Sequence, residues 1–104
     1  MRRLNARDLL SIQVRTVQDS LPDTVLFQGR PQPLTKNERL AAGRAVWFVV
    51  QKGYGITTAV PIASGSFGVS ELKIERAVRA AFPDDYFHRL ERTKNRIMLR
   101  EEDE

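Results

Sequence analysis

Aromatic and basic residues alternate over a short stretch near the middle of the chain. Trp47 and Phe48 are followed by Lys52 and then by Tyr54 in the string Lys-Gly-Tyr-Gly. An aromatic ring can stack on any nucleic-acid base, and a nearby cation can hold the phosphate backbone. The pattern indicates binding to single-stranded nucleic acid, RNA above all. The alternative interpretation is that these aromatics belong to the core, because the four consecutive large apolar residues from Trp47 to Val50 cannot all face solvent.

The string from Trp47 to Gly55 resembles the first two strands of the cold-shock domain, an OB-type family that binds nucleic acid. The resemblance implies that the aromatics lie on one face of a sheet and stack on bases, with Lys52 beside them. Phe67, followed by Gly-Val-Ser, resembles the third strand of the same family and is a further candidate for stacking. The resemblance covers about 30 of the 104 residues.

A second constellation runs from Ile62 through Phe67-Gly68-Val69-Ser70 to Arg79. It is similar to the turn and recognition helix of bacterial helix-turn-helix regulators. A turn of small residues lets the second helix leave at a steep angle, so that its polar face enters the major groove of DNA. The resemblance implies that Lys73, Arg76 and Arg79 contact bases or phosphates. The competing interpretation is an ordinary amphipathic helix.

The strongest concentration of positive charge lies close to the C-terminus. Five basic residues fall within 12 positions: Arg89, Arg92, Lys94, Arg96 and Arg100. The formal net charge of +4 conceals this distribution, because residues 1–100 carry +8 and the last four residues, 101–104, are all acidic. A basic cluster of this kind is the electrostatic footprint of a nucleic-acid binder. In the helix-turn-helix interpretation, a hairpin over 86–100 would be its wing.

A third resemblance, to the ProQ/FinO family, also implies RNA binding. It depends on Leu21-Pro22, Pro33-Leu34, the helix after Ser70, and Tyr86 followed by the string Arg-Ile-Met-Leu at 96–99. A hypothesis of another class remains beside these: a protein-interaction adaptor or inhibitor, which the mixed charge and the acidic tail fit equally well.

Several kinds of chemistry are excluded by composition. The chain has no cysteine and one histidine, His88, so that disulfides, thiolate nucleophiles, cysteine-based zinc sites and multi-histidine metal sites are out. No phosphate-binding loop or dinucleotide fingerprint is present. We therefore expect no enzymatic activity, no cofactor and no metal. No apolar run approaches the roughly 20 residues that cross a bilayer, and the sequence predicts a cytoplasmic protein that does not bind membranes. A homodimer and a protein partner stay open.

The elements that must position these side chains follow from length and pattern. A length of 104 residues, 41% of them hydrophobic, fits one α+β domain over 1–100 with an acidic tail at 101–104. The predicted order is an N-terminal helix at about 6–20, a β-prone run at 24–28, a helix near 35–44, a β-hairpin near 46–60, a helix at 70–82 and a C-terminal β-hairpin or helix-strand.

The end of the second helix is the main ambiguity. Thr35 and Glu38 form a capping box that fixes its start. The helix then either stops near Gly43 or continues to Gly53. The β-branched and aromatic run from Val46 favours the hairpin, and Pro61 to Gly68 is then predicted to be a loop.

Overall fold

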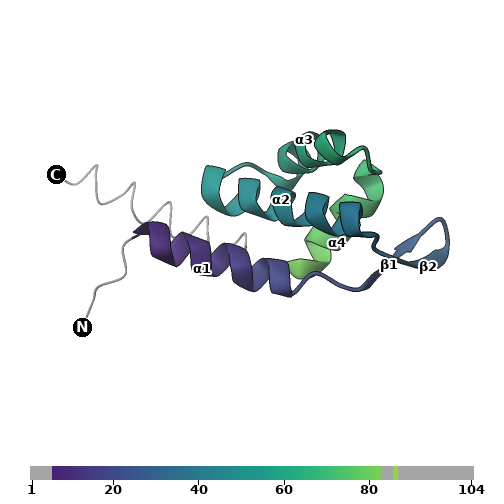
Figure 1. Ribbon diagram of the computed structural model, residues 1–104, viewed down its shortest axis with the longest axis horizontal. Helices are drawn as coiled ribbons and strands as arrows, with labels where there is room; N and C mark the ends of the chain where they lie inside the picture. Colours follow the sequence, from purple (N-terminus) through teal and green to yellow (C-terminus); the bar gives the residue numbers. More distant parts are fainter. Residues whose placement is uncertain (1–5, 83–85, 87–104) are drawn as a thin grey trace.

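The computed structural model describes residues 6–82 and residue 86, with side chains from Ser11 onward. The elements in chain order are α1 (Ala6–Asp19), β1 (Thr24–Phe27), β2 (Arg30–Pro33), α2 (Lys36–Lys52), α3 (Ile56–Phe67) and α4 (Glu71–Ala81). Figure 1 shows a helical body from one end of which the two-stranded hairpin projects. The predicted α+β class is confirmed, as are the helices at about 6–20 and 70–82.

The hairpin is closed by a two-residue turn in which both residues have positive φ. Gln28 has φ 53° and Gly29 has φ 75°, and Phe27 pairs with Arg30 across the turn. Such turns match the natural twist of the flanking strands, which is why they dominate tight hairpins. The sequence predicted the first strand and missed the second, whose two prolines, Pro31 and Pro33, are tolerated because β2 is an edge strand.

Helix α2 begins at the predicted capping box and runs 17 residues to a left-handed glycine cap. The Thr35 hydroxyl accepts from the Glu38 amide at 3.2 Å, and the Glu38 carboxylate accepts from the Thr35 amide at 2.8 Å. Gly53, with φ 71°, ends the helix. The predicted stop near residue 44 is therefore too early.

The hairpin predicted near 46–60 is wrong, since this segment forms the end of α2 and the start of α3. The cause lies in packing. At helical spacing, Val46, Val49 and Val50 fall on one buried face, where the local β preference of valine is outweighed by the apolar area that they bury. The strands that the cold-shock resemblance implies over this string are helices.

The loop predicted from Pro61 to Gly68 is also wrong, because α3 continues through it to Phe67. Pro61 lacks the amide that would bond the Thr57 carbonyl. Both residues are exposed, so that water can solvate that carbonyl.

Helix α2 lies at the centre of the core and packs against α1, α3 and α4. Six alanines with no exposed surface let the helices approach closely: Ala41, Ala42, Ala45, Ala59, Ala63 and Ala77. Ile74 and Val78 of α4 are likewise fully buried. The core thus fixes α3 and α4 against a common support.

The C-terminal element predicted over 86–100 and the acidic tail at 101–104 fall outside the described residues, apart from Tyr86. The ring of Tyr86 packs on that of Phe82, with 4.7 Å between centroids. Within the described part of the chain, no helix combines the length and the apolar character needed to cross a membrane.

Candidate nucleic-acid interface

Helices α3 and α4 are joined by the three residues Gly68, Val69 and Ser70. Gly68 has φ 64°, a left-handed conformation that glycine adopts without strain. The Gly68 and Val69 amides both donate to the Ser64 carbonyl, the latter at 3.1 Å. Ser70 then begins α4 in an extended conformation. The sequence predicted this turn and the second helix, and the structure adds a first helix of 12 residues.

Helix α4 has one buried and one exposed face. Leu72, Arg76 and Arg79 are exposed and follow one another at spacings of four and three residues, which places them on the same side of the helix. We call these three residues the outer face of α4. Leu72 is 49% exposed and adds an apolar side chain to this face.

Lys73 lies inside the fold and not on the outer face, although the sequence grouped it with Arg76 and Arg79. Its ammonium group is 2.9 Å from the Glu38 carboxylate and donates to the Pro33 carbonyl at 3.2 Å. The residue is 6% exposed. Its charge is therefore used to hold α4 against the start of α2 and the end of the hairpin.

The pKa of Glu38 is lowered by this arrangement. Burial by itself would raise the pKa of the carboxyl group, but hydrogen bonds from Thr35 and from the Lys73 ammonium, together with the charge of Lys73, outweigh it. Glu38 therefore stays ionised at neutral pH and keeps both its helix-capping and its ion-pairing roles.

The two arginines of the outer face differ in their partners. The Arg76 guanidinium donates to the carbonyl of Leu26 in β1. Arg79 pairs with Glu75 one turn earlier, at 2.9 Å, and its side chain is 56% exposed. Strand β1 thus lies alongside the outer face of α4, with Arg76 between them.

A second set of aromatic and basic side chains gathers on the C-terminal half of α2, and we call it the Trp47 cluster: Arg44, Trp47, Phe48, Lys52 and Tyr54. The Arg44 guanidinium carbon is 4.4 Å from the Trp47 ring centroid, and the Lys52 nitrogen is 5.6 Å from it. Phe48 meets Trp47 edge-on at 5.2 Å and stacks on Tyr54 at 5.6 Å.

The structure therefore brings together three predicted site residues, Trp47, Lys52 and Tyr54, on a helix and the turn after it rather than on a sheet. Arg44 belongs to this cluster although it was not among the predicted site residues. Its spacing of three residues before Trp47 places both on one side of a helix, and only the assumption of a hairpin hid this relationship.

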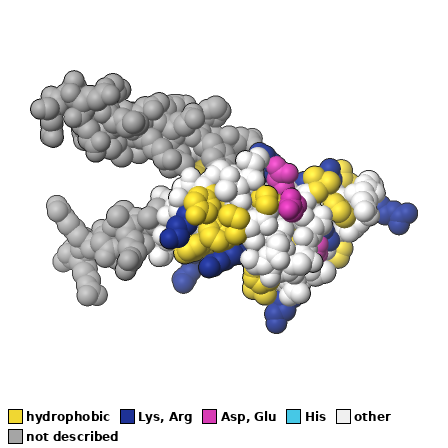
Figure 2. Space-filling model, turned by 90° about the horizontal axis from the view of Figure 1, so that it is seen from above, with side chains coloured by type: hydrophobic (Ala, Val, Ile, Leu, Met, Phe, Trp, Pro, Cys, Tyr) yellow, Lys and Arg dark blue, Asp and Glu magenta, His cyan; other side chains and the backbone are white. Residues whose placement is uncertain are grey.

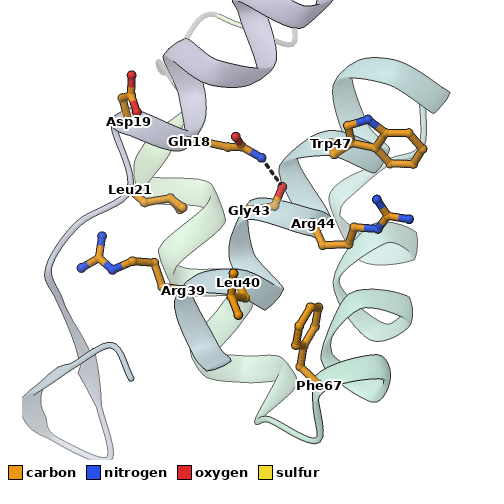
Figure 3. A pocket seen from close by; sticks show the side chains of 9 residues that line it. All are labelled: Gln18, Asp19, Leu21, Arg39, Leu40, Gly43, Arg44, Trp47 and Phe67. Atoms are coloured by element: carbon orange, nitrogen blue, oxygen red, sulfur yellow. Dashed lines mark hydrogen bonds between the residues drawn. The ribbon is translucent and has the colours of Figure 1, made fainter. Parts of the chain in front are cut away.

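Phe67 lies near the same cluster, across a groove of about 590 Å³ between α1, α2 and the end of α3. Figure 3 shows that Leu40 and Trp47 of α2 also line this groove, and that the Gln18 amide donates to the Gly43 carbonyl, at 2.8 Å. Figure 2 shows hydrophobic side chains beside lysine and arginine on one part of the visible face, and basic side chains at the end from which the hairpin projects.

The remaining predicted contacts lie outside the described residues: Arg89, Arg92, Lys94, Arg96 and Arg100. Among the residues that are described, no group of three or more histidine, cysteine, aspartate or glutamate side chains could hold a metal ion.

No protein-family model, curated protein or solved structure matches this chain. Two surfaces of the described residues are candidate binding sites, the outer face of α4 and the Trp47 cluster. The Lys73–Glu38 pair holds the start of α4 at the first turn of α2. Trp47 lies nine residues after Glu38, about 14 Å further along the axis of α2, so that the two surfaces are separate.

Proposed function

We propose that this protein binds duplex DNA through the helix-turn-helix unit of α3 and α4, with α4 entering the major groove. The observation that carries the proposal is the three-residue turn at Gly68, which sets α4 against α2 and α3 by its apolar face and leaves Leu72, Arg76 and Arg79 outward. An α-helix fits the major groove, where each base pair presents a distinct pattern of donors and acceptors.

The exposed side chains of α4 suit base edges. Arginine can donate two hydrogen bonds to guanine, glutamate can accept one from cytosine, and an apolar side chain can contact the thymine methyl group. Arg79 and Leu72, which are exposed, and Glu75, which is partly exposed, offer these three kinds of contact within two turns of one helix. The mixture allows contacts with base edges in addition to the attraction between arginine and phosphate.

The ion pair between Arg79 and Glu75 is no obstacle to such contacts. It is exposed and spans one helical turn, and pairs of this kind contribute about 0.5 kcal/mol or less to stability. Arg79 can therefore exchange Glu75 for a base or a phosphate at small cost.

The proposal is tested by fluorescence anisotropy with a labelled random-sequence DNA duplex of about 30 base pairs at about 50 mM salt, where phosphate contacts are strongest. We expect saturable binding that weakens about tenfold for Arg79→Ala. Arg15→Ala removes an equal, exposed charge from α1 and is the matched control, with an expected change of less than about twofold. Absence of duplex binding at this salt concentration would refute the proposal.

Single-stranded RNA is a second candidate ligand, favoured by the two cations over Trp47. Arg44 and Lys52 lie on the same side of α2 as the indole ring, and neither forms an ion pair within the described residues. A base stacked near Trp47 would have a phosphate-binding charge on either side. Trp47 is the single tryptophan, so that its emission reports this surface alone.

A further inference from the structure

The β1–β2 hairpin is tied to α4 by one side-chain hydrogen bond for each strand. Arg76 donates to the Leu26 carbonyl in β1, and Lys73 donates to the Pro33 carbonyl in β2 at 3.2 Å. A two-stranded hairpin is marginally stable by itself in water. Its position relative to α4 is therefore set by α4, and the two elements form one surface.

The hairpin also contributes to the core at its base. Val25 is 6% exposed and packs in the main hydrophobic cluster, and the Gln32 amide donates to the Phe27 carbonyl across the two strands at 3.2 Å. These contacts leave the turn at Gln28 and Gly29 as the part that projects (Figure 1).

Arg30 stands at this tip with an unneutralised charge. It is exposed, and within the described residues it forms no ion pair. No acidic residue occurs between Asp23 and Glu38, and these two are paired with Arg39 and Lys73. A planar guanidinium in this setting is well suited to bind a phosphate through two hydrogen bonds.

The register fixes where Arg30 lies relative to α4. Leu26, the residue held by Arg76, pairs with Pro31. Arg30 is the next residue toward the tip, so that strand spacing and rise put its Cα about 6 Å from that of Leu26. The tip is thus beside the outer face of α4, on the flank that Arg76 marks.

Strand pairing with another chain is a poor use for this hairpin. The outer edge of β2 carries Pro31 and Pro33, which cannot donate to a further strand, and β1 lies against α4. The accessible chemistry is the cation at the tip.

We infer that the hairpin is a wing that precedes the helix pair in sequence, and that Arg30 binds a backbone phosphate of the duplex beside the groove that α4 enters. The inference rests on the proposed function. It assigns a wing to 24–33, a segment for which the sequence predicted only a β-prone run and an extended connection.

The test is the salt dependence of binding to the random-sequence duplex, for Arg30→Ala and for Arg15→Ala as a control of equal charge. We expect Arg30→Ala to bind about tenfold more weakly at about 50 mM salt, with a slope of log affinity against log salt that is shallower by about 0.9, the value for one phosphate contact. Arg15→Ala should keep the wild-type slope, and Arg30→Lys should restore it.

The possible outcomes separate the two proposals. If the wild-type protein binds duplex and Arg79→Ala weakens binding, while Arg30→Ala keeps the slope of Arg15→Ala, the wing is refuted and the helix-turn-helix function stands. If the wild-type protein does not bind duplex, both are refuted. An unchanged far-ultraviolet circular dichroism spectrum for Arg30→Ala confirms that any loss comes from the missing contact, since the side chain is exposed.

Discussion

The ammonium nitrogen of Lys73 lies 2.9 Å from each carboxylate oxygen of Glu38, across 35 residues of sequence. Both side chains are at least nine-tenths buried. The Glu38 carboxylate also caps the start of α2, and the Lys73 ammonium also donates to the Pro33 carbonyl, so that the pair ties together α2, α4 and the hairpin. The proposed DNA-binding surface is built on this pair.

Breaking the pair from one side should strongly destabilise the fold. Glu38→Gln keeps an oxygen that can accept from the Thr35 amide but leaves the buried ammonium without a counter-charge, and we expect a loss of about 3 kcal/mol in the free energy of unfolding. Adding Lys73→Met should recover most of that loss, because it removes the unpaired charge. Urea unfolding of the single and double variants measures this, and a loss below about 1 kcal/mol for Glu38→Gln would contradict the buried pair.

The lowered pKa of Glu38 predicts a dependence of stability on pH. On acidification the unfolded chain protonates Glu38 near the ordinary value of 4.5, whereas the folded protein does so only at lower pH. Between those two pKa values the unfolded state binds more protons, so that the free energy of unfolding falls as the pH falls. The contribution is complete above pH 4.5 and is lost below it. Urea titrations between neutral and acidic pH should show a steeper decline for wild type than for Glu38→Gln, and equal declines would argue against the pair.

Two glycines of the helix-turn-helix unit should respond in opposite directions to alanine. Gly65 lies within α3 and Gly68 has φ 64°, and a Cβ at either position would meet no atom within 4 Å. Gly65→Ala should stabilise the protein by about 0.5 to 1 kcal/mol through helix propensity. Gly68→Ala should destabilise it by about 1 to 2 kcal/mol, because the left-handed conformation strains alanine. Thermal unfolding of both variants measures these effects. Melting temperatures that shift in the same direction in both variants would contradict the end of α3 at Gly68.

Much of this unit follows from sequence. The apolar spacing of Ile74, Ala77 and Val78 defines α4, and Thr35 with Glu38 defines the start of α2. The burial of Lys73 and Glu38 could also be predicted from the sequence, because each lies on the apolar stripe of its helix. Lys73 is four residues before Ala77, and Glu38 is four residues before Ala42. A charge on each of two facing stripes indicates a buried pair.

The error at 46–60 shows the limit of local patterns. The run of valines at Val46, Val49 and Val50 is compatible with a strand as well as with a helix. The helix is favoured because Ala59 and Ala63 of α3 are small enough to let α2 and α3 pack closely. Such a contact is set by residues distant in sequence. The position of the hairpin against α4 was equally hidden, since it depends on backbone carbonyls that no side-chain pattern reports.

The Trp47 cluster makes a separate prediction about RNA. If single-stranded RNA stacks there, a pyrimidine-rich RNA oligomer should quench the Trp47 emission, and Lys52→Ala should weaken that binding several-fold. Lys36→Ala removes an exposed charge from the opposite end of α2 and should have little effect. Equal losses for the two variants, or no quenching, would exclude the cluster as an RNA site.

Chemical-shift mapping locates the ligand most directly. The uniformly ¹⁵N-labelled protein is titrated with a short random-sequence DNA duplex at low salt, and the amide shifts are followed along the chain. We expect the largest changes between residues 70 and 80 and at the hairpin tip, residues 28–31. Changes confined to residues 44–54, or none at saturating duplex, would contradict DNA binding through α4.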